Sequence, residues 1–116
     1  MPETIRINLR DIVTKEERLA PGHRLCAGCA EPIIIRQILH AIDGPVVVGT
    51  ATGCLEVSTT NYPYTSWRVP WIHSAFENVA TTISGVEAAY RALKRAGRIP
   101  PEKNITFLAI GGDGAS

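Results

Sequence analysis

The feature that most constrains the fold is an uninterrupted run, Val46-Val47-Val48-Gly49-Thr50, which follows Pro45. Most of its residues are β-branched, and apolar and polar residues do not alternate along it. A strand with one solvent-exposed face alternates, whereas a strand covered on both faces of a parallel sheet reads as a continuous apolar run. We therefore predict a central buried strand over residues 46–50.

Two amphipathic segments flank this strand along the chain. A helix is predicted between Pro32 and Ile42, and Asp43-Gly44-Pro45 ends it. A second helix is predicted after Trp71, ending at Gly97, because apolar residues recur there at helical spacings. The apolar positions of the two helices are Ile34, Ile35, Ile38, Leu39 and Ile42, and Val79, Ile83, Val86, Tyr90 and Leu93.

A second buried strand is predicted over residues 104–110, which lead into Gly111-Gly112-Asp113-Gly114. The order strand, helix, strand predicts an α/β fold, specifically part of a doubly wound parallel sheet. Two strands alone would leave sheet edges that further chain or a partner must cover. We therefore expect the chain to be the first part of a longer protein.

Two segments lack a steady period. Residues 1–22 are polar and end in an Ala-Pro-Gly turn, so we predict an N-terminal arm, with residues 23–116 as the beginning of the main domain. Residues 51–70 are rich in Thr, Ser, Pro and Gly but also contain Tyr62, Tyr64 and Trp67. Such bulky side chains favour an ordered, site-forming loop over a linker.

Composition excludes several functional classes. The 116 residues carry a net charge of +1, which favours neither nucleic acid nor an anionic membrane as a partner. No apolar run approaches the roughly 20 residues that cross a bilayer, and the N-terminus resembles no export signal. We therefore expect a cytoplasmic protein with no membrane contact.

Three cysteines are candidate metal ligands, since an odd number in a chain without an export signal argues against a disulfide framework. Cys26 and Cys29 form a C-x-x-C pair, in which Gly28 can adopt unusual backbone angles and let both thiolates face one metal. Zinc sites, redox dithiols and iron-sulfur clusters all use this spacing. Cys54 follows the predicted strand 46–50, where open α/β sheets place functional groups, although a lone cysteine can also be an inert buried thiol.

Gly112-Asp113-Gly114 follows the second predicted strand and is a candidate phosphate and Mg²⁺ site. Glycines let the backbone approach a phosphate closely, and a carboxylate is a ligand that Mg²⁺ prefers. The same residues also form ordinary turns, so their position after a buried strand is what favours a binding site.

Four motifs and the Gly112-Asp113-Gly114 element together resemble the thiamine-diphosphate-binding β subunits of 2-oxoacid:ferredoxin oxidoreductases, most closely those of pyruvate:ferredoxin oxidoreductases. The resemblance runs from about Gly22 to the end. The four motifs are Cys26-Ala27-Gly28-Cys29-Ala30-Glu31, Ala51-Thr52-Gly53-Cys54-Leu55-Glu56, Tyr62-Pro63-Tyr64-Thr65-Ser66-Trp67 and Trp71-Ile72-His73-Ser74-Ala75-Phe76-Glu77-Asn78.

The resemblance implies a metal cluster. Cys26, Cys29 and Cys54 would hold a 4Fe-4S cluster together with a fourth cysteine near the far end of such subunits. This chain has no fourth cysteine. Its absence agrees with our expectation that the chain is part of a longer protein.

The resemblance also implies a cofactor pocket. Glu31 and Cys54 would border thiamine diphosphate, and its diphosphate would lie against Gly112, Asp113, Gly114 and Ala115, with Asp113 on Mg²⁺. No residue is assigned a catalytic role, because the glutamate that activates the cofactor in these enzymes usually comes from another subunit.

The function implied is oxidative decarboxylation of a 2-oxoacid, most closely pyruvate. Coenzyme A would accept the acyl group, ferredoxin would take the electrons, and other subunits would complete the enzyme. Alternatives are another 2-oxoacid, namely 2-oxoglutarate, a branched-chain oxoacid or oxalate. A further alternative is a non-enzymatic interaction domain in which the three cysteines and His23 or His73 bind zinc.

Overall fold

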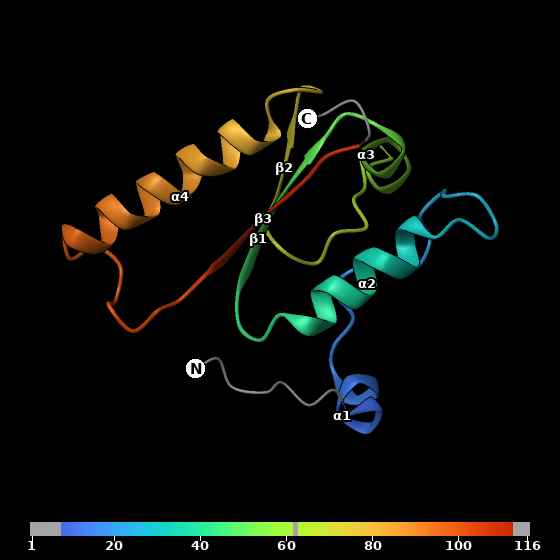
Figure 1. The fold of residues 1–116 in the computed structure, drawn as a ribbon, viewed down its shortest axis with the longest axis horizontal. Coiled ribbons are helices and arrows are strands. Elements are labelled where there is room, and N and C mark those ends of the chain that lie inside the picture. Colours follow the sequence, from blue (N-terminus) through green and yellow to red (C-terminus); the bar gives the residue numbers. More distant parts are fainter. Residues whose placement is uncertain (1–7, 62, 113–116) are drawn as a thin grey trace.

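Strand β1 (Val46–Ala51) is the middle strand of a parallel sheet that lies between helices (Figure 1). The computed structural model describes residues 8–61 and 63–112. Along the chain, the other helices and strands are α1 (Leu9–Thr14), α2 (Glu31–Ala41), α3 (Cys54–Thr59), β2 (Trp71–Ser74), α4 (Val79–Arg95) and β3 (Thr106–Ile110).

The sheet has the order β2-β1-β3, and both pairings are parallel. All residues of β1 except Val47 are buried, which confirms the predicted central strand. The α/β class and the partial doubly wound parallel sheet are confirmed as well. Because all three strands run in the same direction, their carboxyl ends meet at one edge of the sheet.

Helix α2 covers one face of β1. Ile35 and Leu39 pack in one cluster with Val46 and Val48. The predicted helix is therefore confirmed, with the expected Pro in its first turn. Ile34, expected on the buried face, is 49% exposed because it borders an open cavity at the carboxyl edge of the sheet.

Helix α4 covers the opposite face through Val79 and Ile83, which pack with Ala51 and Phe107. The contact is close at Gly49, where an added Cβ would lie 2.6 Å from two side-chain carbons of Ile83. The second predicted helix is confirmed, but Leu93 is 40% exposed because the last turns of α4 extend past the strands (Figure 1).

The predicted loop over residues 51–70 contains α3, and the segment after it contains β2; neither was expected. Helix α3 has six residues and β2 has four, which is too short for a hydrophobic period to be visible. Threonines in α3 and just after it donate back to the helix, from Thr59 Oγ1 to Leu55 O and from Thr60 Oγ1 to Glu56 O, both at 2.6 Å. These bonds give partners to carbonyl groups at the end of a helix that propensity alone does not favour.

The N-terminal segment was expected to be irregular, but it contains α1, which buries none of its residues. The segment after α1 packs on the main body. Leu19 is buried and forms an isolated antiparallel bridge with Trp67. Arg36 donates to both carboxylate oxygens of Glu17 at 2.6 and 3.1 Å, so an ion pair joins this segment to α2.

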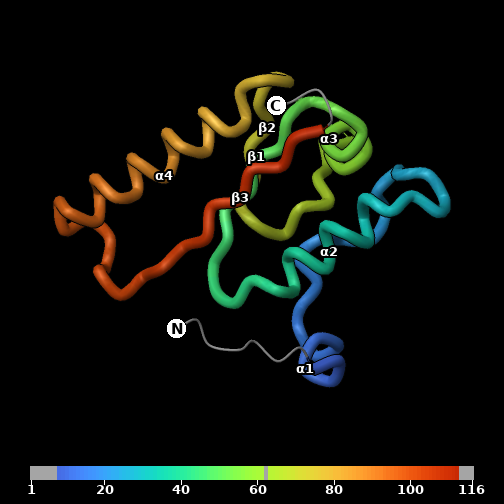
Figure 2. The backbone as a smooth tube through the Cα atoms, viewed as in Figure 1, coloured from blue at the N-terminus to red at the C-terminus, as the bar shows by residue number. Residues whose placement is uncertain are grey.

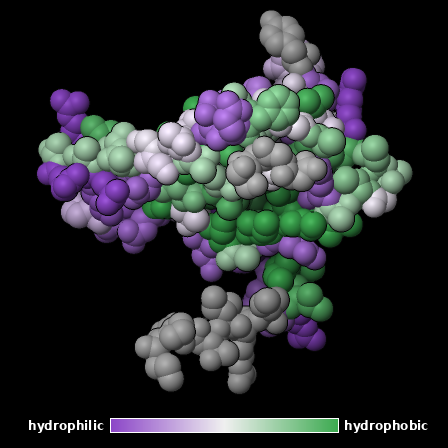
Figure 3. Space-filling model, turned by 45° about the horizontal axis from the view of Figure 1, so that its top comes forward, coloured by the Kyte–Doolittle hydropathy of each residue, from purple (hydrophilic) through white to green (hydrophobic). Residues whose placement is uncertain are grey.

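The surface combines apolar and charged regions. In Figure 3 a band of hydrophobic residues crosses the middle of the visible face, whereas the outer end of α4 is hydrophilic. Large exposed apolar side chains include Ile33 of α2, Val57 of α3 and Phe76 before α4. Over residues 8–61 and 63–112, the structure contains no helix with the length and apolarity needed to span a membrane.

Candidate functional site

A cavity of about 190 Å³ opens at the carboxyl ends of β1 and β3, between α2 and α3. In open α/β sheets, ligands bind in this position, outside the carboxyl ends of the strands. Apolar side chains of both helices and of β3 form most of its wall. The residues that line it include Glu31, Ile34, Cys54, Leu55, Gly111 and Gly112.

Three residues that the sequence assigned to a cofactor pocket line this one cavity. Glu31 begins α2, Cys54 begins α3 and Gly112 follows β3. They are far apart in the sequence, and the parallel sheet brings them to the same edge. The other residues assigned to the pocket, Asp113, Gly114 and Ala115, lie outside the described residues, as does Tyr62.

Glu31 has an unsatisfied carboxylate oxygen. Its Oε2 is buried and has no hydrogen-bond partner among the described residues. A buried polar atom without a partner costs on the order of 1–3 kcal/mol, unless a ligand or water supplies the missing bond. Glu31 is therefore suited to accept a hydrogen bond from a ligand in the cavity.

Cys54 is exposed and follows Gly53 directly at the start of α3. The far end of α3 is anchored by a buried contact in which Trp67 Nε1 donates to Thr59 Oγ1 at 2.9 Å. The thiol therefore lies on a short helix whose position is set by contacts with the surrounding chain.

Cys26 and Cys29 lie in the loop before α2. Cys29 N donates to Cys26 O at 3.0 Å, and Gly28 has a φ of 81°, so the expected tight turn is present. Figure 2 shows this loop beside the start of α2, away from the strands. Neither cysteine lines the cavity.

The structure does not assemble a metal site from the described residues. Within residues 8–61 and 63–112, no three His, Cys, Asp or Glu side chains form a group able to hold a metal ion. The structure therefore does not bring the three cysteines together. It also does not place His23 or His73 with them, as a zinc site would require. None of the three cysteines forms a disulfide.

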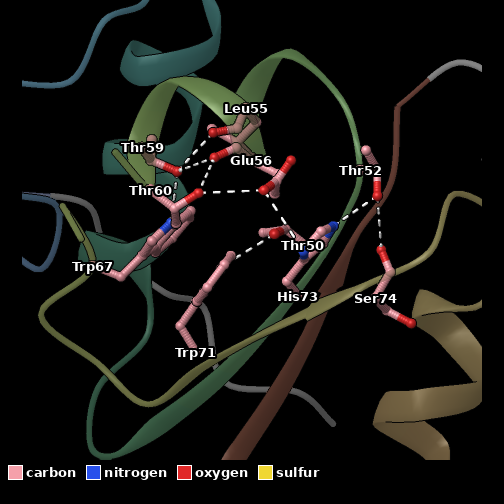
Figure 4. Close-up of polar contacts among 10 residues, drawn as sticks. All are labelled: Thr50, Thr52, Leu55, Glu56, Thr59, Thr60, Trp67, Trp71, His73 and Ser74. Atoms are coloured by element: carbon pink, nitrogen blue, oxygen red, sulfur yellow. Dashed lines mark hydrogen bonds and ion pairs between the residues drawn. The ribbon is translucent and has the colours of Figure 1, made fainter. Parts of the chain in front are cut away.

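A polar network on the other side of α3 was not predicted (Figure 4). His73 of β2 contacts Thr52 and Glu56, with 2.7 Å from Nε2 to Thr52 Oγ1 and 3.6 Å from Nδ1 to Glu56 Oε1. From the sequence, His73 is either a satisfied core or loop histidine or an alternative zinc ligand, and its contacts could not be predicted because β2 was not recognised. Once β2 is known, its register places His73 opposite Thr50 at the carboxyl edge of the sheet.

The resolved pKa shifts lie away from the cavity. The hydrogen bond from Arg36 holds the pKa of Glu17 below its ordinary value. A hydrogen bond from Lys15 likewise lowers the pKa of Asp43. Both carboxylates are near the amino ends of the strands, so they belong to the packing of the N-terminal segment.

The cavity can accommodate part of a cofactor. Its apolar wall suits an organic ring, the backbone at Gly112 is open to close approach by a phosphate, and Glu31 offers an acceptor. Ligand sites commonly enclose about 300–1,000 Å³, so a cavity of 190 Å³ would hold a fraction of a ligand as large as thiamine diphosphate.

No protein-family model matches the chain. Among curated proteins, pyruvate synthase subunit PorB of Thermotoga maritima is 52% identical over 119 residues, covering 100% of this chain and 37% of that protein. Pyruvate synthase subunit PorB of Methanocaldococcus jannaschii is 56% identical, covering 88% of this chain and 34% of that protein. Ketoisovalerate oxidoreductase subunit VorB of Pyrococcus abyssi is 28% identical, covering 100% of this chain and 36% of that protein. The chain thus spans about a third of the length of these relatives.

Proposed function

Because the chain belongs to the family of pyruvate synthase PorB subunits over the part of their length that it spans, we propose that it is part of the β subunit of a 2-oxoacid:ferredoxin oxidoreductase. Its preferred substrate would be pyruvate, since several relatives that are 41–56% identical to the chain are named pyruvate synthase subunits. The enzyme would work as a complex with other subunits.

The observation that carries the proposal is the shared cavity of Glu31, Cys54 and Gly112. Each was assigned to a thiamine diphosphate pocket on separate sequence motifs, and they line one cavity at the edge where α/β sheets bind ligands. The buried, unpartnered oxygen of Glu31 supports this use. Thiamine diphosphate, when bound, supplies the electron sink that allows CO₂ to leave a 2-oxoacid.

The residues of this chain would orient the cofactor and exclude water. Glu31 would accept a hydrogen bond from it, and the apolar wall would keep water from the reacting carbon. The backbone at Gly112, Gly114 and Ala115 would lie against the diphosphate. Asp113, outside the described residues, would bind Mg²⁺, which prefers carboxylate oxygens.

Electron transfer would require a second group, a 4Fe-4S cluster. Cys26, Cys29 and Cys54 would be three of its ligands, and a fourth would come from outside this chain. Thiolates are the usual ligands of such clusters. Cys54 lies on the cavity wall, so it would connect the cofactor pocket to the cluster. Ferredoxin would be the electron acceptor and coenzyme A the acyl acceptor.

A second substrate is favoured by one comparison. The ketoisovalerate oxidoreductase subunit is 28% identical over the whole of this chain, so a branched-chain 2-oxoacid is the main competitor of pyruvate. Steady-state kcat/KM values for pyruvate and 2-oxoisovalerate, measured on the assembled enzyme, distinguish them. We expect the value for pyruvate to be the larger.

The proposal is tested by anaerobic iron, sulfide, zinc and thiamine diphosphate analysis of the full-length, co-expressed complex. Wild type should contain about four irons per 4Fe-4S site in this subunit, and Cys54→Ala should lose them. Ser58→Ala, a substitution elsewhere on α3, is the matched control and should keep them. Wild-type protein without iron would refute the cluster, and one bound zinc in its place would favour the zinc-stapled interaction domain.

A further inference from the structure

The imidazole of His73 is held in a defined orientation at the carboxyl edge of the sheet. Its strand register places it opposite Thr50 of β1. Its ring stacks on Trp71, with centroids 6.2 Å apart and planes 14° from parallel. Trp71 is fixed in turn, because its Nε1 donates to the buried Thr50 hydroxyl at 3.0 Å (Figure 4). Packing thus sets where the two ring nitrogens of His73 lie.

Those nitrogens contact the chain on both sides of Cys54. Nε2 lies 2.7 Å from Oγ1 of Thr52, which precedes the cysteine. Nδ1 lies 3.6 Å from Oε1 of Glu56, which follows it. The first contact is a hydrogen bond, and the second is an ion pair when the imidazole is protonated. The ring therefore bridges the two ends of the turn that carries Cys54.

Helix α3 depends on such contacts. It has six residues, and its N-cap, Gly53, provides no side-chain hydrogen bond. A helix of this length is not stable by itself, so tertiary contacts must fix it. The Trp67–Thr59 bond anchors its last turn. Its first turn, which carries Cys54, is joined to β2 by the His73 contacts and by Thr52 N donating to Ser74 O at 3.1 Å.

The hydrogen-bond directions form a consistent chain. The Thr52 hydroxyl also lies 3.3 Å from the carbonyl oxygen of Ser74. It has one proton, so it satisfies both contacts when it donates to Ser74 O and accepts from Nε2–H of His73. The Glu56 carboxylate then faces Nδ1, and the two groups attract each other when the imidazole carries a proton on both nitrogens. The hydrogen bond to Thr52 joins the segment 52–56 to β2 in either form of the ring.

We infer that His73 is a positioning residue that holds the segment 52–56 against β2 and thereby places the Cys54 thiolate at the cavity wall. This inference rests on the proposed function for the role of Cys54 as a cluster ligand. Groups that orient a metal ligand without binding the metal commonly change metal affinity or activity by about 10- to 100-fold when removed. His73 would act in this way through Thr52 and Glu56.

The test uses the full-length subunit in its assembled complex. Three readouts are compared: the electron paramagnetic resonance spectrum of the reduced cluster, kcat with pyruvate, and hydrogen exchange of a peptide spanning residues 52–60. His73→Ala removes both contacts, whereas in His73→Gln the amide nitrogen can still donate to Thr52. The matched control is His40→Gln, because His40 forms a similar histidine–glutamate contact, 3.5 Å from Nε2 to Oε2 of Glu17, near the amino edge.

We expect His73→Ala to change the cluster spectrum, lower kcat by about tenfold and speed exchange in residues 52–60, with exchange in α4 unchanged. His73→Gln should recover part of the loss, and His40→Gln should match wild type. The combined effect of Thr52→Val and His73→Ala should be smaller than the sum of the two single effects, because the two substitutions share the bond between His73 and Thr52. A merely destabilised fold would instead speed exchange throughout the subunit.

Two results would overturn the inference. One is a His73→Ala enzyme whose spectrum, kcat and local exchange match those of the control. The other is strictly additive effects of His73→Ala and Thr52→Val. If wild type holds no cluster, the proposed function fails, but positioning by His73 can still be tested. Faster hydrogen exchange in His73→Ala, confined to residues 52–60, would support it. Unchanged exchange in that variant would refute it.

Discussion

The two ends of β1 differ in how nearby carboxylates are satisfied. At the amino end, Lys15 donates to Asp43 at 2.8 Å and Arg36 donates to Glu17 at 2.6 Å. At the carboxyl end, Glu31 keeps a buried oxygen with no partner among residues 8–61 and 63–112. The paired carboxylates attach the N-terminal segment to the fold, whereas Glu31 retains the capacity to bind something else.

Two groups at the amino end depart from this pattern. Arg18 Nη1 and His40 Nε2 are also buried without a hydrogen-bond partner in the described part of the chain. However, Arg18 Nη2 donates to Gly44 O at 2.7 Å, and His40 Nε2 lies 3.5 Å from Glu17 Oε2, so the fold partly satisfies both side chains. The cavity beside Glu31 is therefore the end of the sheet organised for a ligand.

The largest expected effect is on the carboxylate of that cavity. In the full-length complex, Glu31→Gln should weaken thiamine diphosphate binding by about 10- to 100-fold, since a hydrogen bond to a charged group is replaced by a neutral one. Glu17→Gln, at the amino end, should leave the affinity within about twofold. Calorimetric titration of both variants measures the affinity. Equal losses of affinity in the two variants would show that Glu31 has no special role in cofactor binding.

The next effect is on the packing of α4 against β1. Gly49→Ala would place a Cβ 2.6 Å from Ile83 carbons, so we expect the full-length subunit to lose about 1–3 kcal/mol of unfolding free energy. Gly85→Ala is the matched control, because a Cβ there meets nothing within 4 Å. It should stabilise helix α4 by about 0.5–1 kcal/mol. Denaturant unfolding gives both values, and a loss in both variants would contradict the packing described.

A smaller effect is expected at the anchor of α3. Trp67→Phe keeps the aromatic packing but removes the hydrogen bond from Nε1 to Thr59. The expected loss is about 0.5–1.5 kcal/mol, the ordinary contribution of one hydrogen bond. Thermal unfolding measures it, with Trp71→Phe as a comparison at the bond to Thr50. If Trp67→Phe is neutral, the Trp67–Thr59 bond does not anchor α3.

The smallest effect is the pH dependence of the amino end. Since the folded protein lowers the pKa of Glu17, the contribution of its ion pair is complete above the ordinary pKa of glutamate and is lost as pH falls through the lowered value. The pair is partly exposed, at 51% for Arg36 and 34% for Glu17, so it contributes about 0.2–1 kcal/mol at most. Unfolding of wild type and Glu17→Gln across acidic pH should converge at the lowest pH. If the difference in unfolding free energy between the two proteins stays constant as the pH falls, the pKa of Glu17 is not lowered by folding.

Much of the fold could be predicted from the sequence because its main elements bury apolar side chains periodically. The run 46–50 and the apolar positions of α2 and α4 specified the central strand and the two helices that cover it. The short elements α1, α3 and β2 were missed because they bury few side chains. Their stability comes from caps, threonine hydroxyls and pairing with distant residues, and none of these produces a local pattern.

The candidate site was predicted in part. Glu31, Cys54 and Gly112 were chosen on motifs, and the sheet brings them to one cavity. Assembly of the cysteines into one ligand set stays a prediction, as do the roles of Asp113, Gly114 and Ala115. The contacts of His73 with Thr52 and Glu56 were not predicted, because they depend on the register of an unrecognised strand.

We propose that the cavity at the carboxyl edge is part of a thiamine diphosphate site. An experimental structure of the full-length complex with thiamine diphosphate and Mg²⁺ would show whether the cofactor binds there. We predict cofactor density beside Cys54 and Gly112, with a donor of the cofactor within about 2.7–3.2 Å of Glu31 Oε2. Cofactor density elsewhere, with the Glu31 oxygen bonded to protein alone, would contradict the account.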